Sequence, residues 1–311
     1  MEKIKYILIT GAAGFIGTNL VRRLVSLGFR IVCFDMHYSE RFLSEFESKV
    51  HLYEGNLSDK EVLAAINTKF RLSYVFHLAG SKARTNGMND FNDTMDNNYF
   101  GTLNLLESLT NNNSIKKIIL VGTIDEYGEL STDFKESSAE TPLSAYGLSK
   151  LACTKLGLIF YKQYNLPITI VRPSIVYGHN QGMEMFIPSV IEALLNNNSF
   201  DMTKGEQERD FLHIDDLIDV IMNIKESLNT NGEVFNVGSG SSIKIADIAL
   251  HIAKVLQKEH LLNIGVIPYR DAESMNYSVS IMKAKEILSW VPKIDIIKGI
   301  ERIILQTINT Q

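Results

Sequence analysis

Tyr146 and Lys150 are the two side chains whose types and spacing best suit chemistry. They lie four positions apart in a helical pattern that runs from about 144 to 164. This spacing puts both on one helix face, one turn apart. An ammonium beside a phenol lowers the pKa of the tyrosine, which can then take a proton from an alcohol while a hydride leaves its carbon, or return it. Such pairs are also frequent on surface helices, so the interpretation depends on their surroundings.

Thr123 follows a short apolar strand that the sequence predicts over 117–121. We expect its hydroxyl to hydrogen-bond the reacting carbonyl or alcohol oxygen and to orient that oxygen against Tyr146. The alternative is a threonine that only closes the turn after the strand.

A glycine-rich turn near the start of the chain predicts a site for a dinucleotide. Residues 4–9 are almost all apolar, as in a strand buried on both faces, and Gly11, Gly14 and Gly17 follow, with Phe15 and Ile16 opening a helical pattern. Glycines there allow a sharp turn, close approach of a diphosphate and tight helix packing. The free N–H groups and the dipole of the helix favour phosphates. The alternative is an ordinary tight turn.

Asp35 ends a second predicted strand over 30–35. A carboxylate at this place can accept hydrogen bonds from both hydroxyls of the adenosine ribose and would repel a 2′-phosphate. No arginine follows at 36 or 37. The sequence therefore favours NAD, with NADP as the alternative cofactor and a simple strand-end turn as the alternative role for Asp35.

Strands and helices alternate over the first 170 residues or so, which predicts a doubly wound parallel α/β sheet of the Rossmann type. Further strands are expected over 50–54, 73–77 and 168–171, with a long helix over 90–113. Ligands bind at the carboxyl ends of such strands. Asn56 is therefore expected beside the adenine, unless it caps the next helix as Ser58 or Asp59 also could.

The remainder of the chain has a less regular pattern and is expected to form a smaller lobe that closes over a substrate. We predict helices over 185–196, from 213 and over 243–257, strands over 233–237 and 264–268, and two terminal helices. The predicted division is a cofactor-binding domain over 1–172 and a mainly substrate-binding lobe over 173–311, with segments exchanged between them.

Composition excludes several classes of function. A net charge of −5 gives no sign of a nucleic-acid face. The two cysteines, Cys33 and Cys153, are too few and too far apart for a zinc site or a disulfide framework, so no metal is expected. No apolar run reaches the length of a membrane span. We expect a cytoplasmic enzyme with no membrane partner.

Together these motifs resemble the extended short-chain dehydrogenase/reductases, in the NAD-dependent epimerase/dehydratase group that acts on nucleotide sugars. The resemblance covers nearly the whole chain. Its further segments are His77-Leu-Ala-Gly80, Asn98-Tyr-Phe-Gly-Thr-Leu-Asn-Leu-Leu-Glu107, Thr123-Ile-Asp-Glu-Tyr-Gly128 (similar to SxxxVYG), Arg172-Pro-Ser-Ile-Val-Tyr-Gly178 (similar to RxxNVYG), Arg209-Asp-Phe-Leu-His-Ile-Asp-Asp216 and Phe235-Asn-Val-Gly238.

The resemblance implies roles for residues that the patterns alone do not assign. Thr123, Tyr146 and Lys150 would form the catalytic triad, with Lys150 also on the nicotinamide ribose and Asn98 supporting a proton relay. Arg209 would bind the substrate's diphosphate, as its fork-shaped guanidinium suits. The implied cofactor contacts also include Phe15, Ile16, Leu57, Leu78, Ala79, Gly80, Lys82 and Pro173, and the implied substrate contacts include Asp125. A homodimer through the 90–113 and 144–164 helices is also implied.

Departures from the family pattern bear on the reaction. The 4,6-dehydratases carry an acid pair directly after the threonine, but here Ile124 stands first and Asp125 and Glu126 follow one place late. The asparagine of RxxNVYG is Ile175. These departures lean toward a reductase, whereas Asp35 leans toward NAD and hence toward an epimerase. The central prediction is an epimerase-like enzyme that transfers hydride at sugar carbon 4. The alternative, favoured by the 205–211 segment, is a reductase of 4-keto-6-deoxy nucleotide sugars; a dehydratase or a non-catalytic NAD-sensing protein is less favoured.

Overall fold

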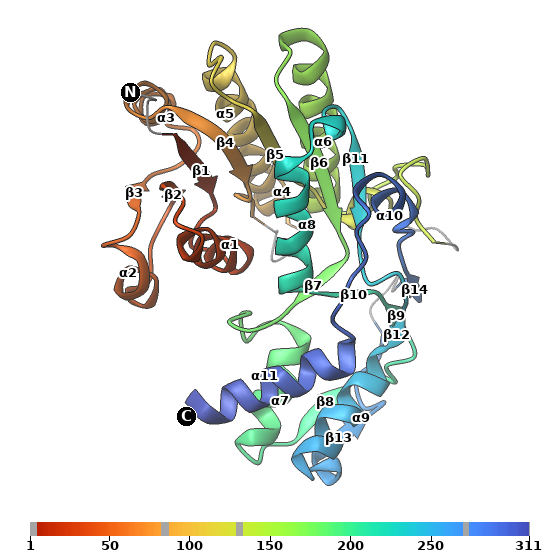
Figure 1. Cartoon of the computed structure of the whole chain (residues 1–311). Coiled ribbons are helices and arrows are strands. Elements are labelled where there is room, and N and C mark those ends of the chain that lie inside the picture. Colours follow the sequence, from red (N-terminus) through yellow and green to blue (C-terminus); the bar gives the residue numbers. More distant parts are fainter. Residues whose placement is uncertain (1–4, 82–86, 129–132, 270–273, 311) are drawn as a thin grey trace. The chain divides into compact units, whose positions relative to one another are not determined.

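The computed structural model in Figure 1 describes residues 5–81, 87–128, 133–269 and 274–310 of the 311-residue chain. The chain divides into two compact units. The first comprises Met1–Gly128, Ser138–Arg172 and Ile218–Phe235, and the second comprises Glu129–Ser137, Pro173–Leu217 and Asn236–Gln311. Each unit is therefore assembled from three stretches of the chain.

A seven-stranded sheet with the order β11-β6-β5-β4-β1-β2-β3 forms the centre of the first unit. This confirms the predicted doubly wound α/β fold. The chain runs from β1 to β2 and β3 on one side and then crosses to β4 on the other, so the ends of β1 and β4 lie side by side, with Thr10 paired to His77. Such a switch in strand order opens a crevice for a ligand. The strands are β1 (Tyr6–Thr10), β2 (Ile31–Asp35), β3 (His51–Glu54), β4 (Leu72–His77), β5 (Lys117–Val121), β6 (Ile168–Pro173) and β11 (Val234–Val237).

β11 was expected in the lobe after residue 172, but it joins the central sheet beside β6. The amide of Ile170 donates to the carbonyl of Glu233, and that of Ser174 donates to the carbonyl of Val237. Without β11, the edge of β6 would have unpaired backbone N–H and C=O groups. Pairing with β11 gives these groups hydrogen-bond partners.

Helices cover the sheet of the first unit. Apolar side chains of α3 (Lys60–Lys69), α5 (Gly101–Leu109) and α6 (Ala145–Tyr164) pack against β1, β2, β4, β5 and β6 in one core. α1 (Phe15–Ser26) and α8 (Ile214–Glu226) lie on the side of the sheet turned to the viewer in Figure 1. The remaining helical segments here are α2 (Glu40–Phe46), α4 (Met88–Met95), η2 (Ile124–Glu126) and η3 (Leu228–Thr230).

The prediction of one continuous helix over 90–113 is wrong in detail. Helical structure runs from Met88 to Leu109, and a π-helical turn, η1 (Asp96–Phe100), separates α4 from α5. A π turn inserts one extra residue and redirects the side chains around it. Here it buries Asn98, a polar residue that a regular apolar face would not place inside.

The second unit has a core of its own. Apolar residues of α7 (Phe186–Leu195), α9 (Ile245–Leu256) and α11 (Ile296–Thr310) form it. Short strands pair around this core: β7 (Ile175–Tyr177) with β10 (Phe211–His213), β8 (Phe200–Met202) with β13 (Leu262–Ile264), and β9 (Glu208–Arg209) with β12 (Ile243–Lys244) and β14 (Asn276–Tyr277). The unit also contains η4 (Glu259–Leu261) and α10 (Met282–Leu288).

The strand predicted over 264–268 is also wrong, because β13 spans Leu262–Ile264 and stops there. Gly265 adopts a left-handed φ of +87°, and its amide donates to the carbonyl of Met202. The chain therefore turns at this glycine and leaves Val266 and Ile267 exposed.

Within the described ranges, none of the helices has both the length and the apolar character needed to cross a bilayer.

Candidate active site

The first unit brings Thr123, Tyr146 and Lys150 together at the carboxyl end of β5. Thr123 stands two residues after β5, while Tyr146 lies in the first turn of α6 and shares a side-chain hydrogen bond with Thr123. The buried ammonium of Lys150 donates to the carbonyl of Val121 at 2.9 Å. All three predicted catalytic side chains therefore converge on one place.

Local structure explains this convergence. Ser144 caps α6 by accepting a hydrogen bond from the amide of Gly147 at 3.0 Å, which starts the helix directly before Tyr146. A Cβ on Gly147 would lie 2.5 Å from the carbonyl oxygen of Asp125. Only glycine lets the start of α6 approach the turn after β5 so closely.

The electrostatics around Tyr146 differ from the expectation. Burial raises the pKa of Tyr146, as do the negative charges of Asp125 and Glu126, and the hydrogen bond with Thr123 lowers it. The net pKa is raised, whereas the Tyr-Lys spacing alone predicted a lowered one. Burial also lowers the pKa of Lys150, against the charges of Cys153 and Glu126. Burial, which is the larger cause, and the charges of Asp125 and Glu126 account for the difference, and the spacing argument left out both.

Asn98 connects the π turn with the loop after β4. Its side-chain oxygen accepts a hydrogen bond from the amide of Ser81 at 2.7 Å, and its nitrogen donates to the carbonyl of Ser81 at 2.9 Å and to Ser149 Oγ at 2.8 Å. A Cβ on Gly80 would lie 3.0 Å from Lys150 Nζ and 3.2 Å from Asn98 Oδ1. Asn98 and Gly80 are therefore neighbours of Lys150, and Lys82 lies outside the described residues.

A series of buried, hydrogen-bonded side chains lies behind this site and was not predicted from the sequence. His77 Nδ1 lies 2.6 Å from Thr10 Oγ1, and His77 Nε2 lies 2.8 Å from Thr102 Oγ1. Burial and the charge of Lys150 lower the pKa of His77 to about 3, so the ring is neutral. Because Thr102 donates its proton to the carbonyl of Asn98 at 2.6 Å, Nε2 of His77 is the donor to Thr102. These hydrogen bonds connect β1 and β4 to the π turn.

The glycine turn fits a dinucleotide. Gly11 has a φ of +70°, and a Cβ there would lie 2.5 Å from the amide nitrogen of Ala79. A Cβ on Gly17 would lie 2.0 Å from the carbonyl oxygen of Gly11. Gly14, the N-cap residue of α1, offers no side-chain hydrogen bond to the first turn. Within the described residues, then, the backbone N–H groups that open this helix are available to a diphosphate.

Asp35 is held beside that turn. Its Oδ2 accepts a hydrogen bond from the amide of Ala13 at 2.7 Å, and its Oδ1 accepts one from the amide of Met36 at 2.8 Å. Each carboxylate oxygen has a second lone pair. Asp35 can therefore accept ribose hydroxyls while it stays attached to the glycine turn.

The other predicted cofactor residues lie close after strand ends or at the start of α1. Asn56 follows β3 and is exposed; its Oδ1 accepts a hydrogen bond from the amide of Ser58 at 2.9 Å, while Asp59 caps α3. The capping alternative for Asn56 is therefore wrong. Phe15 and Ile16 open α1, Leu57 is buried against Gly101, Leu78 and Ala79 follow β4, and Pro173 ends β6.

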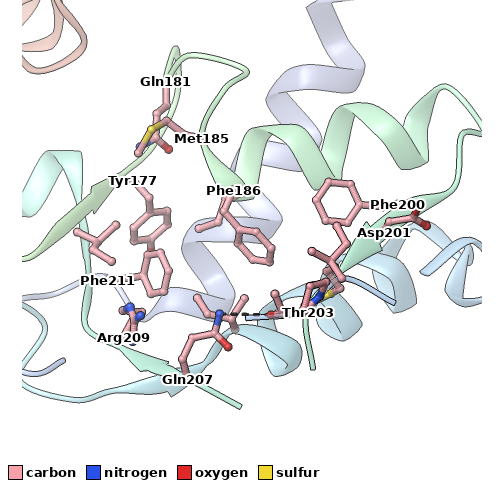
Figure 2. A pocket seen from close by; sticks show the side chains of 16 residues that line it. Tyr177, Gln181, Met185, Phe186, Phe200, Asp201, Thr203, Gln207, Arg209 and Phe211 are labelled. Atoms are coloured by element: carbon pink, nitrogen blue, oxygen red, sulfur yellow. Dashed lines mark hydrogen bonds between the residues drawn. The ribbon is translucent and has the colours of Figure 1, made fainter. Parts of the chain in front are cut away.

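The second unit contains a pocket of about 440 Å³ (Figure 2). Its wall is mostly apolar, with the aromatic rings of Phe186 and Phe200 on one side and those of Tyr177 and Phe211 on another. Arg209, predicted to bind a diphosphate, lines this pocket, and its guanidinium also lies 5.7 Å from the ring centre of Tyr277.

Gln207 is a pocket residue that the sequence reasoning missed. The residue is 8% exposed, and its side-chain nitrogen donates to Thr203 Oγ1 at 3.4 Å. Among the described residues, its side-chain oxygen has no hydrogen-bond partner. A buried amide oxygen without a partner in an apolar pocket is costly unless a ligand donates to it. The position of Gln207 two residues before Arg209 was the signal that could have pointed to it.

A model of the NAD dependent epimerase/dehydratase family matches residues 7–238. The chain belongs to this family. It is therefore an NAD-dependent enzyme, and the family predicted from the motifs is confirmed.

Relatives within the family catalyse different reactions. The dTDP-D-glucose 4,6-dehydratase of Dictyostelium discoideum is 32% identical over 280 residues, which are 81% of this chain and 62% of that protein. The UDP-glucuronate 4-epimerase of Thermodesulfobacterium geofontis is 29% identical over 310 residues, which are 96% of this chain and 94% of that protein.

A solved structure shows the same architecture. The UDP-glucuronic acid 4-epimerase of Bacillus cereus, in complex with UDP-glucuronic acid and NAD, superposes with a TM-score of 0.88 at 29% identity and covers 97% of this chain and 99% of that one. That structure contains NAD, in agreement with the cofactor predicted here.

Proposed function

We propose that this enzyme is a nucleotide-sugar 4-epimerase that moves hydride at carbon 4 of the sugar. The observation that carries the proposal is the turn after β5. Ile124 is 2% exposed, and Glu126 is fully buried against Arg172, so Asp125 is the one acid of this turn that is partly exposed. The 4,6-dehydratases, by the resemblance described above, place two acids there. The turn retains the residues for hydride transfer and lacks the second acid for removal of water.

The residues of the first unit can perform both halves of such a reaction. Bound NAD supplies a hydride acceptor and later a hydride donor. Thr123 orients the oxygen on carbon 4, and Tyr146 takes its proton during oxidation and returns it during reduction. The ammonium of Lys150 favours the phenolate when Tyr146 acts as a base. Asn98 fixes the loop at Ser81 and thereby the surroundings of Lys150.

The identity of tightly held cofactor tests this proposal. Purified protein is denatured, and the released dinucleotide is identified by chromatography and absorbance. Near-stoichiometric NAD or NADH, together with interconversion of UDP-glucose or UDP-glucuronic acid with the 4-epimer, supports an epimerase. A protein that releases no dinucleotide, and that oxidises NADH or NADPH only with a 4-keto-6-deoxy nucleotide sugar, is the reductase that the 205–211 segment suggested.

The pocket of the second unit is proposed to hold the nucleotide part of the substrate. Its aromatic walls suit a base, and the Gln207 side-chain oxygen can accept a hydrogen bond from the nucleoside. Arg209 can bind the diphosphate through two N–H groups.

We expect Gln207→Leu to weaken binding of both UDP and uridine by about tenfold, because one hydrogen bond is lost. Arg209→Met is expected to weaken the binding of UDP by about thirtyfold. It is expected to leave the binding of uridine nearly unchanged, because uridine carries no phosphate. Titration calorimetry measures all four affinities. Lys204→Met, at an exposed neighbour outside the pocket wall, is the control. Equal losses for uridine and UDP in Arg209→Met would contradict the diphosphate role.

We also propose a homodimer through the helices of the first unit. Phe100, Leu148 and Ile159 on η1 and α6 are 50%, 40% and 46% exposed, which is unusual for large apolar side chains on neighbouring helices. Light scattering is expected to give twice the 35.0 kDa chain mass, and Leu148→Glu with Ile159→Glu is expected to give the monomer mass. A wild-type monomer would contradict the proposal.

A further inference from the structure

Glu126 lies in the catalytic turn, three residues after Thr123, and it has no role in the reaction described so far. Its carboxylate is fully buried and contacts three different elements of the first unit. Oε1 accepts a hydrogen bond from the backbone amide of Thr123 at 3.0 Å. Oε2 accepts hydrogen bonds from Thr154 Oγ1 at 2.8 Å and from Arg172 Nε at 2.7 Å.

These contacts join the residues that must act together. Thr123 is at the end of β5, and Arg172 is near the end of β6. Thr154 follows Tyr146 and Lys150 on α6 at successive intervals of four residues, so it shares their helix face. The carboxylate of Glu126 thus ties the backbone of Thr123 to the helix that carries Tyr146 and Lys150.

Gly122 makes room for this carboxylate. A Cβ at position 122 would lie 2.2 Å from Glu126 Oε1 and 3.4 Å from Cγ of Arg172. The space is already filled by the carboxylate, so any larger residue would displace it. Gly122 and Glu126 are therefore complementary features of this chain.

Glu126 is surrounded by donors. Burial raises the pKa of Glu126 and is the larger effect, so the net pKa is raised, while Arg172 and the hydrogen bonds from Thr123 and Thr154 lower it. Because each of these groups donates, they all favour the ionised carboxylate. The guanidinium of Arg172 is shared with Glu140, whose Oε1 accepts from it at 2.6 Å. Neither of the hydrogen bonds at Thr123 and Thr154 involves Glu140.

We propose that Glu126 is a positioning residue that holds Thr123 against Tyr146, with Gly122 and Thr154 as its partners, in the hydride-transfer reaction of this enzyme. The proposal rests on the proposed function for its kinetic test. It also has an electrostatic consequence. Burial is the largest cause of the raised pKa of Tyr146, and the charges that add to it are those of Asp125, Glu126 and Cys153. Loss of the Glu126 charge must move the titration of Tyr146 toward lower pH.

Glu126→Gln is expected to lower kcat by about 100-fold with KM within about twofold, because an amide cannot accept from Thr123 and from the pair Thr154 and Arg172 at once. Its pH profile for kcat is expected to move toward lower pH by about one pH unit. Glu140→Gln is the matched control, since it removes a carboxylate from the same Arg172 without touching Thr123. A wild-type kcat and pH profile in Glu126→Gln, or an equal loss in Glu140→Gln, would overturn the proposal.

Thr154 provides a second test in case Glu126→Gln does not fold. Thr154→Val is expected to lower kcat by about fivefold at unchanged KM, and Thr154→Ser, which keeps the hydroxyl, is expected to recover most of that loss. Equal kcat values for the valine and serine variants would contradict the role of this hydrogen bond.

The titration of Tyr146 can be measured without substrate. It therefore tests the role of Glu126 separately from the proposed function. In NAD-loaded protein labelled with carbon-13 at tyrosine Cζ, the Tyr146 signal is assigned with Tyr146→Phe and titrated by NMR. We expect Glu126→Gln to lower the pKa of Tyr146 and Glu140→Gln to leave it unchanged. A wild-type protein without turnover of nucleotide sugars refutes the proposed function. An unchanged Tyr146 titration in Glu126→Gln refutes the role of Glu126.

Discussion

We expect Tyr146→Phe to lower kcat by about 1,000-fold and to leave NAD bound. In the proposed reaction the phenol, which shares a hydrogen bond with Thr123, carries the proton, and general acid–base groups contribute on this scale. The ring stays in place at the start of α6, because Ser144 and Gly147 determine where that helix begins. Steady-state kinetics with UDP-glucose or UDP-glucuronic acid measures kcat, and the dinucleotide released on denaturation measures NAD.

Tyr161→Phe is the matched control for this result. Tyr161 lies on the same helix, and its ring contacts the region of Gly232. We expect the control to keep kcat within about twofold, since its hydroxyl takes no part in proton transfer. If Tyr146→Phe retained every activity of the wild type, the catalytic role of Tyr146 would be wrong, and a protein that binds NAD without turnover would explain the chain better.

Gly11→Ala is expected to abolish stable NAD binding and to destabilise the fold, whereas Gly28→Ala is expected to cost only about 1 kcal/mol of unfolding free energy. Both glycines have a left-handed φ, +70° at Gly11 and +76° at Gly28. A Cβ at Gly11 would lie 2.5 Å from the backbone of Ala79, while a Cβ at Gly28 would have no neighbour within 4 Å among the described residues. The two variants therefore separate a steric clash at the cofactor site from backbone strain alone.

Denaturant unfolding of the two variants, with the NAD content of each, checks this prediction. Gly28→Ala should keep stoichiometric NAD, because Gly28 only ends α1 and lies a helix length away from the glycine turn. Similar NAD loss in both variants would show that general destabilisation, and not the contact between Gly11 and Ala79, empties the site.

Much of the architecture was predictable because local patterns determine it. The strands β1, β2, β4, β5 and β6 were predicted from apolar runs close to their observed bounds, since strands buried on both faces of a parallel sheet are almost wholly apolar. β3, at the edge of the sheet, was also predicted, although its residues are partly or largely exposed. β11 was predicted as a strand but placed in the wrong part of the molecule. Its partner β6 lies about 65 residues earlier in the chain, and periodicity carries no information about strand pairing over that distance.

The sequence by itself was enough to predict the family and the cofactor, because Gly11 and Gly17 belong to a motif whose spacing is local. The catalytic roles of Thr123, Tyr146 and Lys150 come from equally local motifs and stay predictions. The tertiary structure alone decided what surrounds them. The burial of Asn98 in the π turn, the carboxylate of Glu126 between Thr123, Thr154 and Arg172, and the burial of Gln207 all depend on contacts between distant segments. Burial and nearby charges reversed the pKa shift of Tyr146 that was expected from Lys150. The reason is that side chains from several elements contribute to the electrostatic potential at the Tyr146 hydroxyl.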